Sequence, residues 1–492
     1  MTLGPPPRSG SGRPNVVLFV VDDMGWTDSG AYGSTYYETP SIDRLASEGM
    51  LFTDAYAASP VCTPTRASIL TGKYPARLGI TGAVGHMSSP PADAPPYPET
   101  AAPHDRVIAP VSQRFLDPRE STLPKALGAA GYRTGHFGKW HLGGRRRHWP
   151  EHHFDIAWHA IPDPGPPYPN GYFSPYSFRA GTITPGPLGE YLVDRLTDEA
   201  LAFIDDSRDR PFLLNVWHFA VHGPWDHKVE YTEQFARKRE PAGPHRNPIM
   251  ASMLRSVDES LGRIMARLSG LGLSDRTVIV LTSDHGGNVT SNTGGNWGMF
   301  EADDRRRNDW LRWAGEQPPT SNHPLRQGKG SVYEGGVRVP LIVSWPGVIP
   351  AGTRSSEVVM SIDLYPTLLD LLGLPKPPGT AFDGVSFAAV LRDPAATLDR
   401  DAVFTFMPHA FPTERPGVTA RQGKWKLIRW LDVQPPEPVH ELFDLAEDVG
   451  ERENLAERRP EVVERLEGLI DEFVRETGAR LPKPNPAYDP AA

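Results

Sequence analysis

The stretch Asn15-Val-Val-Leu-Phe-Val-Val21, followed at once by Asp22 and Asp23, decides the fold. A short apolar run bounded by polar residues is typical of a strand buried on both faces of a sheet. Similar runs follow along the chain, and amphipathic stretches that predict helices alternate with them. This alternation predicts an α/β fold with a large, mainly parallel mixed sheet flanked by helices. Strands are expected at 15–21, 212–219, 277–282 and 340–345, and helices at 41–49, 190–204, 248–268 and 363–371.

Polar side chains follow three of these predicted strands directly. Asp22 and Asp23 follow the first, His222 follows the second, and Asp284 and His285 follow the third. Ligands of open α/β sheets bind beyond the carboxyl ends of the strands. The sequence therefore predicts that these residues converge on one site.

The acidic residues among them predict a metal. Adjacent carboxylates such as Asp22 and Asp23 repel each other, so a metal cation or a Lys/Arg partner is expected beside them. With Asp284 and His285 they form an oxygen-rich set with one imidazole. Such a set suits Ca²⁺, with Mg²⁺ or Mn²⁺ as alternatives.

The only cysteine of the chain lies in Cys62-Thr-Pro-Thr-Arg66. Thr63 is a suitable helix cap, Pro64 suits a first helical position, and Gly72 suits the far end. Cys62 is thus expected just before a helix N-terminus, which favours an anion, with Arg66 one turn away. This pattern indicates a nucleophile beside an anionic substrate, although a lone cysteine can equally be a small buried apolar residue.

The chain resembles the formylglycine-dependent sulfatases, in the arylsulfatase-A-like branch of the alkaline phosphatase superfamily. The signature is Cys62-x-Pro-x-Arg66 followed by Leu70-Thr-Gly72; Thr65 stands where relatives often have Ser or Ala. The resemblance extends over roughly residues 15 to 485, with further motifs in family order. These motifs are Gly138-Lys-Trp-His-Leu-Gly143, Val221-His-Gly-Pro224, Ser283-Asp-His-Gly-Gly287, Gly328-Lys-Gly330 and Tyr333-Glu-Gly-Gly-Val-Arg-Val-Pro340.

The resemblance implies an alkaline-phosphatase-like fold and a sulfuric ester hydrolase acting on a small-molecule sulfate ester. It implies that a transient partner, the formylglycine-generating enzyme, oxidises Cys62 to formylglycine. The catalytic residues that it implies are Cys62, Arg66, Lys139, His141, His222 and Lys329. The metal ligands that it implies are Asp22, Asp23, Cys62, Asp284 and His285.

In the mechanism that the resemblance implies, the hydrated aldehyde at residue 62 attacks sulfur in line with the leaving oxygen. Lys139 and Lys329 hold the sulfate oxygens, and His222 or Lys329 stabilises or protonates the leaving group. His141 removes the proton of the second hydroxyl, so that the aldehyde re-forms and sulfate is expelled. Arg66 orients the diol.

Three other functions are compatible with the same residues. A phosphonate monoester or phosphodiester hydrolase would use the same set, and His285 favours it because many sulfatases have Asn there. Unmodified Cys62 could act as a thiolate nucleophile or redox sensor. A non-catalytic protein could bind a metal or anion through the same cluster.

The domain organisation is predicted from shifts in composition. Residues 1–14 are expected to be flexible, 15–390 to form the catalytic domain, and 391–492 to form a smaller α+β subdomain. That subdomain is predicted to hold an antiparallel sheet, with strands within 402–406 and 417–430, and a helix at 459–477. The segments 88–111, 143–187 and 286–327 are predicted to be loops that wall the pocket. The basic runs 145–147 and 305–307 are expected to be solvated surface.

Composition limits the remaining possibilities. The 492 residues are 39% hydrophobic and 23% charged, which is typical of a globular protein. A net charge of −9 gives no case for nucleic acid, and one cysteine excludes an internal disulfide. No signal-peptide pattern or membrane-spanning run is found, so a cytoplasmic location without membrane contact is expected. The oligomeric state is not indicated.

Overall fold

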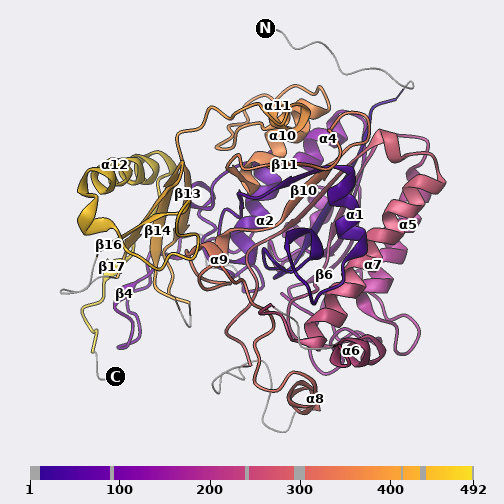
Figure 1. The fold of residues 1–492 in the computed structure, drawn as a ribbon, viewed down its shortest axis with the longest axis horizontal. Helices are drawn as coiled ribbons and strands as arrows, with labels where there is room; N and C mark the ends of the chain where they lie inside the picture. The colour runs from indigo at the N-terminus through magenta and orange to yellow at the C-terminus, as the bar shows by residue number, and fades with distance from the viewer. Residues whose placement is uncertain are drawn as a thin grey trace.

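The structure is a computed structural model that describes residues 12–88, 93–238, 243–292, 305–411, 414–432 and 439–489. A nine-stranded sheet lies at its centre, with strand order β11-β2-β10-β9-β1-β8-β5-β6-β7 (Figure 1). The predicted mainly parallel mixed sheet flanked by helices is confirmed. Most of the predicted N-terminal segment 1–14 lies outside the described residues.

The core of the sheet is parallel. β1 (Asn15–Val21) lies between β8 (Phe212–Trp217) and β9 (Thr277–Ser283), and pairs with both in parallel. β5 (Arg133–Lys139) and β6 (Ile156–Ile161) continue the parallel order beyond β8. The antiparallel pairs lie toward the edges, made by β10 (Leu341–Ser344) with β9 and with β2 (Met50–Phe52), and by β7 (Ala180–Gly181) with β6. β11 (Thr353–Ser355) closes one edge by pairing in parallel with β2.

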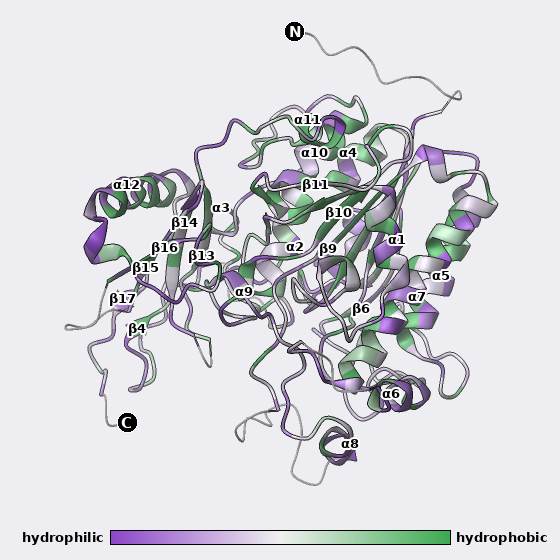
Figure 2. Ribbon diagram, in the orientation of Figure 1, coloured by the Kyte–Doolittle hydropathy of each residue, from purple (hydrophilic) through white to green (hydrophobic). Residues whose placement is uncertain are grey.

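Helices cover both faces of this sheet, which explains why β1 is apolar throughout. Val17, Phe19 and Val21 pack against one layer of helices, while the alternate residues of β1 pack against the other. Central strands such as β1 are accordingly hydrophobic along most of their length, while helices such as α5 and α7 are amphipathic (Figure 2). The first layer contains α1 (Pro40–Glu48), α5 (Leu192–Ser207) and α7 (Pro248–Gly270). The second contains α2 (Cys62–Thr71), α4 (Leu123–Ala129), α10 (Leu364–Leu371) and α11 (Ala388–Arg392).

The C-terminal part forms the predicted antiparallel sheet with a helix against it (Figure 1). Its strands are β13 (Val403–Met407), β14 (Gly417–Gln422), β15 (Trp425–Trp430) and β16 (His440–Asp444), and α12 (Pro460–Thr477) packs on β14 and β15. The expected strand segment 417–430 is a hairpin that turns at Gly423, whose φ of 56° suits glycine. The boundary near residue 390 stays a prediction.

The three predicted loops are wrong in part: segment 88–111 contains the short strand β4 (Val107–Ile108). Segment 143–187 contributes β6 and β7 to the large sheet, and segment 286–327 contains α8 (Arg305–Trp313). The basic run 145–147 is exposed as expected, but Arg306 is buried, because it packs on the ring of Tyr168 beside Asp226. Such tertiary contacts are not visible in a run of like charges.

The remaining helices and strands are short. They are β3 (Ala55–Tyr56), β4 (Val107–Ile108), β12 (Val359–Met360), β17 (Lys483–Pro484), α3 (Pro75–Leu78), α6 (Val229–Ala236) and α9 (Glu334–Val337).

A buried ion cluster joins the C-terminal sheet to the large sheet's loops. Lys426 of β15 lies 2.9 Å from Glu334 of α9 and 2.8 Å from Glu451. Burial raises the pKa of Glu334, but the positive charges of Lys426, Arg338 and Arg421 outweigh burial and bring that pKa to about 2. Burial raises the pKa of Glu451 to about 7. Lys426 is the one cation in direct contact with both carboxyl groups among the described ion pairs.

Replacing Lys426 is therefore expected to destabilise the protein. Lys426→Met leaves two buried carboxyl groups without their shared cation, which costs about 3–5 kcal/mol for a broken buried pair. Urea unfolding measures the loss. The matched control is Lys424→Met, because Lys424 pairs with Asp444 at the surface and such pairs contribute about 0–1 kcal/mol. Equal losses in the two variants would contradict the role of the cluster.

Candidate active site

Two neighbouring strands deliver the predicted carboxylates to one edge of the sheet. In the parallel pairing of β1 with β9, Val21 lies opposite Ser283. Asp22 and Asp284 therefore leave the sheet at the same level, followed by Asp23 and His285. All four are buried. The structure thus brings together the side chains that the strand-end pattern placed at one site.

Helix α2 brings Cys62 to the same point. The helix begins at Cys62 itself, with extended Val61 as its N-cap, so the prediction that Cys62 precedes the helix is wrong by one residue. Thr63 is the second residue of the helix and therefore makes no cap, and its hydroxyl accepts a hydrogen bond from the N–H of Gly85 at 3.3 Å. Gly72 ends the helix as predicted, with a φ of 68°. Cys62 remains in the first turn, where the helix dipole favours negative charge.

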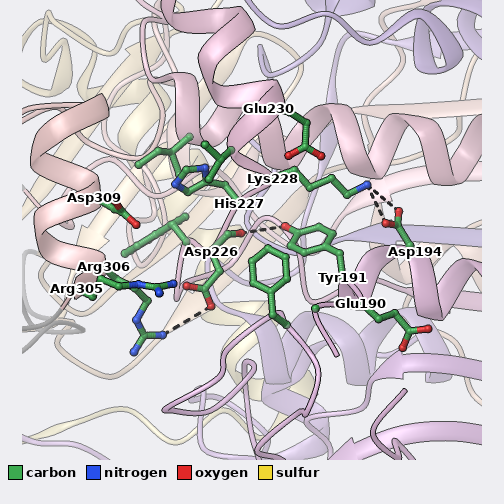
Figure 3. A pocket seen from close by; sticks show the side chains of 15 residues that line it. Glu190, Tyr191, Asp194, Asp226, His227, Lys228, Glu230, Arg305, Arg306 and Asp309 are labelled. Carbon is green, nitrogen blue, oxygen red and sulfur yellow. Dashed lines mark hydrogen bonds and ion pairs between the residues drawn. The ribbon is translucent and has the colours of Figure 1, made fainter. Parts of the chain in front are cut away.

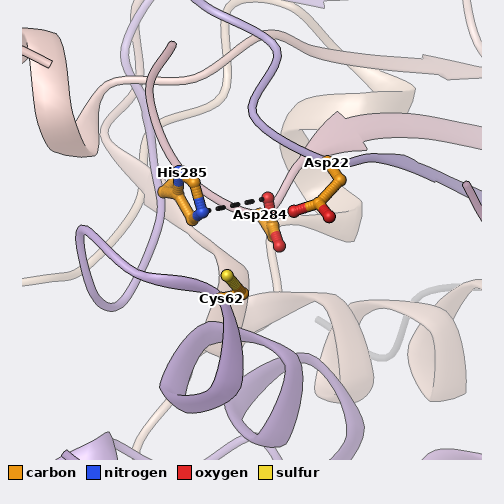
Figure 4. A group of neighbouring side chains, drawn as sticks. All are labelled: Asp22, Cys62, Asp284 and His285. Atoms are coloured by element: carbon orange, nitrogen blue, oxygen red, sulfur yellow. Dashed lines mark ion pairs between the residues drawn. The ribbon is translucent and has the colours of Figure 1, made fainter. Parts of the chain in front are cut away.

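Asp22, Cys62, Asp284 and His285 form a candidate metal centre. Each offers one ligand atom, and these atoms lie within 4.8 Å of one another (Figure 4). Asp23 adjoins them, since its Oδ1 lies 3.2 Å from Nε2 of His285. Oδ1 of Asp22 is buried and receives no hydrogen bond from the described residues. Carboxylate oxygens with one imidazole fit Ca²⁺ or Mg²⁺, and the imidazole also admits Mn²⁺.

Three cations lie against the three carboxylates. Lys139, at the end of β5, places Nζ 2.5 Å from Oδ2 of Asp22. Lys329 places Nζ 2.8 Å from Oδ1 of Asp23, and Arg66 places Nη2 2.8 Å from Oδ2 of Asp284. These cations and carboxylates are almost fully buried, so their charges must balance within the cluster.

The cluster changes the ionisation of Cys62 and His285. Burial raises the pKa of the Cys62 thiol, but Lys139 and Lys329 outweigh burial and bring the pKa to about 5. Burial lowers the pKa of His285, but Asp284 and Asp23 outweigh it and bring the pKa to about 9. We therefore expect unmodified, metal-free protein to hold a thiolate beside an imidazolium at neutral pH.

His222 and His141 complete the set of expected catalytic side chains. Nδ1 of His222 donates to the carbonyl of Gly223 at 2.6 Å, which leaves its Nε2 for the site. Nε2 of His141 lies 3.0 Å from Nδ1 of His86, a residue that belongs to none of the recognised motifs. Burial lowers the pKa of His222 and lowers that of His141 well below its usual value. Both rings are therefore neutral at pH 7.

The residues after His222 line a cavity of about 640 Å³ (Figure 3). Trp225, Asp226 and His227 contribute to its wall. Tyr172 connects this wall to the site, because its N–H donates to Asp226 at 3.0 Å and its hydroxyl donates to the carbonyl of His222 at 2.8 Å. Nε2 of His409, from the C-terminal part, is hydrogen-bonded to the hydroxyl of Thr81 at 2.8 Å.

Comparison with known proteins identifies the family. Residues 14–374 match the Sulfatase family, and residues 327–476 match the family described as N-sulphoglucosamine sulphohydrolase, C-terminal. The chain belongs to the sulfatase family, in agreement with the resemblance read from its motifs.

Curated relatives agree with this assignment. N-acetylgalactosamine-6-sulfatase of Sus scrofa is 33% identical over 384 residues, which cover 76% of this chain but only 65% of the relative. Arylsulfatase A of Homo sapiens is 31% identical over 502 residues, covering 93% of this chain and 87% of the relative.

Solved structures show the same architecture. The crystal structure of Ps i-CgsB in complex with k-i-k-neocarrahexaose aligns with a TM-score of 0.73 at 26% identity, covering 94% of this chain and 92% of that one. The phosphonate monoester hydrolase of Agrobacterium radiobacter has a TM-score of 0.63 at 19% identity, covering 96% of each chain, and shows the shared fold alone. No helix among the described residues is both long and apolar enough to cross a bilayer.

The thiolate state of Cys62 is directly measurable, because the chain has no other cysteine. In unmodified protein freed of metal with a chelator, the ultraviolet absorbance of the thiolate is expected to titrate with a midpoint near pH 5. Lys139→Gln removes a neighbouring positive charge and is expected to move the midpoint upward. A midpoint at the ordinary thiol value of about 8.5 would contradict this electrostatic account.

Metal binding is expected to depend on Asp284. A ligand that binds only the folded protein stabilises it by about 2.7 kcal/mol at a hundredfold excess over Kd. We expect Ca²⁺ to raise the melting temperature of chelator-treated wild-type protein and to have a much smaller effect on Asp284→Asn. The control is Asp117→Asn, a change in a surface ion pair with Arg119. An equal response to Ca²⁺ in all three proteins would place the metal elsewhere.

Proposed function

We propose that the protein is a sulfuric ester hydrolase that converts a small-molecule sulfate ester to an alcohol and sulfate. The observation that carries the proposal is the position of Cys62, in the first turn of α2 and within one cluster of three buried carboxylates and three buried cations. The family supports the same chemistry. A cytoplasmic location remains part of this proposal.

Two groups would complete the site. Asp22, Asp23, Asp284 and His285, together with residue 62, would hold Ca²⁺, or else Mg²⁺ or Mn²⁺, which supplies positive charge at the reacting centre. Formylglycine, made from Cys62 by a formylglycine-generating enzyme, would supply as its hydrate one hydroxyl for attack and a second for release of sulfate.

The charges of the cluster favour an anionic substrate once a metal is bound. Without a metal, Asp22, Asp23 and Asp284 are balanced by Lys139, Lys329 and Arg66. A divalent cation on the same carboxylates gives the cluster an excess of positive charge. Lys139 and Lys329 then have ammonium groups to offer to sulfate oxygens. Arg66 remains fixed to Asp284 and to the carbonyl of Lys139, where it orients residue 62.

Proton transfers fall to three side chains. His141 is neutral and buried, so that it can accept a proton from a hydroxyl at residue 62. His222 and Lys329 lie on the side of Asp23, where either can stabilise the leaving oxygen.

A phosphonate monoester or phosphodiester hydrolase is the second candidate. The specific observation is His285 in the metal set, where many sulfatases have Asn. A phosphorus oxyanion is tetrahedral like sulfate, so the same cations would bind it. A non-catalytic metal- or anion-binding protein with unmodified Cys62 is the third candidate.

Initial rates decide among these candidates. With matured enzyme, we expect faster hydrolysis of an aryl sulfate than of a phenylphosphonate ester at equal concentrations. The reverse preference supports the second candidate, and metal binding without turnover of either ester supports the third.

The lysines are expected to act mainly on kcat. Loss of one preorganised positive group at a developing charge costs about 10²- to 10³-fold in kcat. We therefore expect such losses from Lys139→Met and Lys329→Met in steady-state assays. Lys73→Met serves as the control, because Lys73 pairs with Glu120 away from the cluster. Activity of both site variants within twofold of that control would refute the assigned roles.

A further inference from the structure

The side chain of His86 contacts the Nε2 edge of the His141 ring. Its Nδ1 lies 3.0 Å from Nε2 of His141, and the two rings are stacked with centroids 5.3 Å apart. At the other edge of the ring, Nδ1 of His141 is buried and has no hydrogen-bond partner among the described residues. His141 therefore has one nitrogen held by His86 and one free for a reacting group.

The loop that carries His86 is fixed against the site at two points. The N–H of Gly85 donates to the hydroxyl of Thr63, the residue after Cys62. A Cβ at residue 85 would lie 1.9 Å from the carbonyl oxygen of His141, so only glycine allows this approach. The loop is also tied at its start, because the N–H groups of Thr81 and Gly82 both donate to the hydroxyl of Ser112. These contacts hold the His86 ring beside His141.

A hydrogen bond between two neutral imidazoles restricts their tautomers. One nitrogen of the contact must carry the proton and the other must accept it. If Nε2 of His141 carries the proton, its Nδ1 has a free lone pair. If Nδ1 of His86 carries the proton, Nδ1 of His141 must be protonated in the neutral ring and cannot act as a base.

We propose that His86 is a positioning residue for His141: its Nδ1 accepts the Nε2 proton of His141 and so leaves the Nδ1 of His141 free to act as a base. This inference rests on the proposed function, in which His141 takes a proton from a hydroxyl at residue 62. When His141 accepts that proton, the hydrogen bond to His86 stabilises the imidazolium. His86 itself exchanges no proton with substrate.

Two substitutions at residue 86 test the proposal. His86→Leu removes the acceptor, and we expect kcat to fall about 10- to 100-fold, as for other residues that orient a functional histidine. KM is expected to change far less than kcat, because His86 acts through His141. His86→Asn places an amide oxygen near the position of Nδ1 and is expected to restore most of the lost activity. Equal losses in the two variants, or a loss confined to KM, would overturn the proposal.

A pair of glycine substitutions tests the same geometry from the backbone. Gly85→Ala forces the loop away from His141 and is expected to reproduce the fall in kcat of His86→Leu. Gly82→Ala is the matched control, because a Cβ there has its nearest neighbours in the His409 ring at an ordinary 3.5 Å. Equal kcat values for the two alanine variants would count against the placement of His86.

The tautomer of His141 is measured without turnover. Long-range ¹H–¹⁵N spectra of ¹⁵N-histidine-labelled protein distinguish the two tautomers, and the His141 signal is identified by its loss in His141→Gln. We expect the Nε2-protonated form in the wild type and a mixture in His86→Leu. An Nδ1-protonated ring in the wild type overturns the proposal. Failure of the wild type to hydrolyse any ester would instead refute the proposed function, and the spectra would still decide the role of His86.

Discussion

The burial of three carboxylates at one end of a parallel sheet is the constraint on which this structure depends. Asp22, Asp23 and Asp284 are at most 1% exposed, and buried negative charges are tolerated only with close positive partners. Those partners come from separate elements: Lys139 from β5, Arg66 from α2, and Lys329 from the loop before α9. Electroneutrality therefore joins the sheet, the helix and the loop into one site.

The C-terminal part supports the same cluster from a distance. Lys426 forms an ion pair with Glu334 of α9. The next residue, Gly335, packs closely against Gly286: a Cβ at residue 286 would lie 1.8 Å from the carbonyl oxygen of Gly335. Gly286 follows the metal-site residue His285. Gly330, directly after Lys329, packs in turn against the ring of Phe411. The C-terminal part thereby contacts the segments that carry the candidate metal-site residue His285 and Lys329, so that loss of its ion cluster should affect the site as well as stability.

The parts of the fold that local pattern predicts are those with simple hydrophobic periodicity. β1 and β9 are continuous apolar runs, and the predicted ranges agree with the structure to within one residue. β5 was not predicted, because Arg-Thr-Gly-His-Phe-Gly-Lys has neither an apolar run nor a strict alternation, although most of it is buried. Lys139 was consequently assigned to the site only by resemblance to a family. The clustering of Asp22, Asp23, Asp284 and His285 was predictable because these residues follow recognisable strands.

Contacts that arise from tertiary structure were not predictable in this way. His86 and His141 are 55 residues apart, and the loop of His86 carries no motif. Arg306 lies in a basic run that reads as surface, and its burial depends on Tyr168 and Asp226. Thr63, predicted to cap α2, lies inside the helix and accepts a hydrogen bond from Gly85, 22 residues away. Each case involves a partner distant in sequence.

We propose that Cys62 becomes the formylglycine nucleophile of a sulfate ester hydrolase. The most direct test is the mass of the intact active protein from its native host, with a tryptic map of the peptide that contains Cys62. Conversion of the thiol to an aldehyde is expected to remove roughly 18 Da at this residue, in proportion to sulfate ester hydrolysis across preparations. Full activity in protein whose Cys62 remains a thiol would contradict the account.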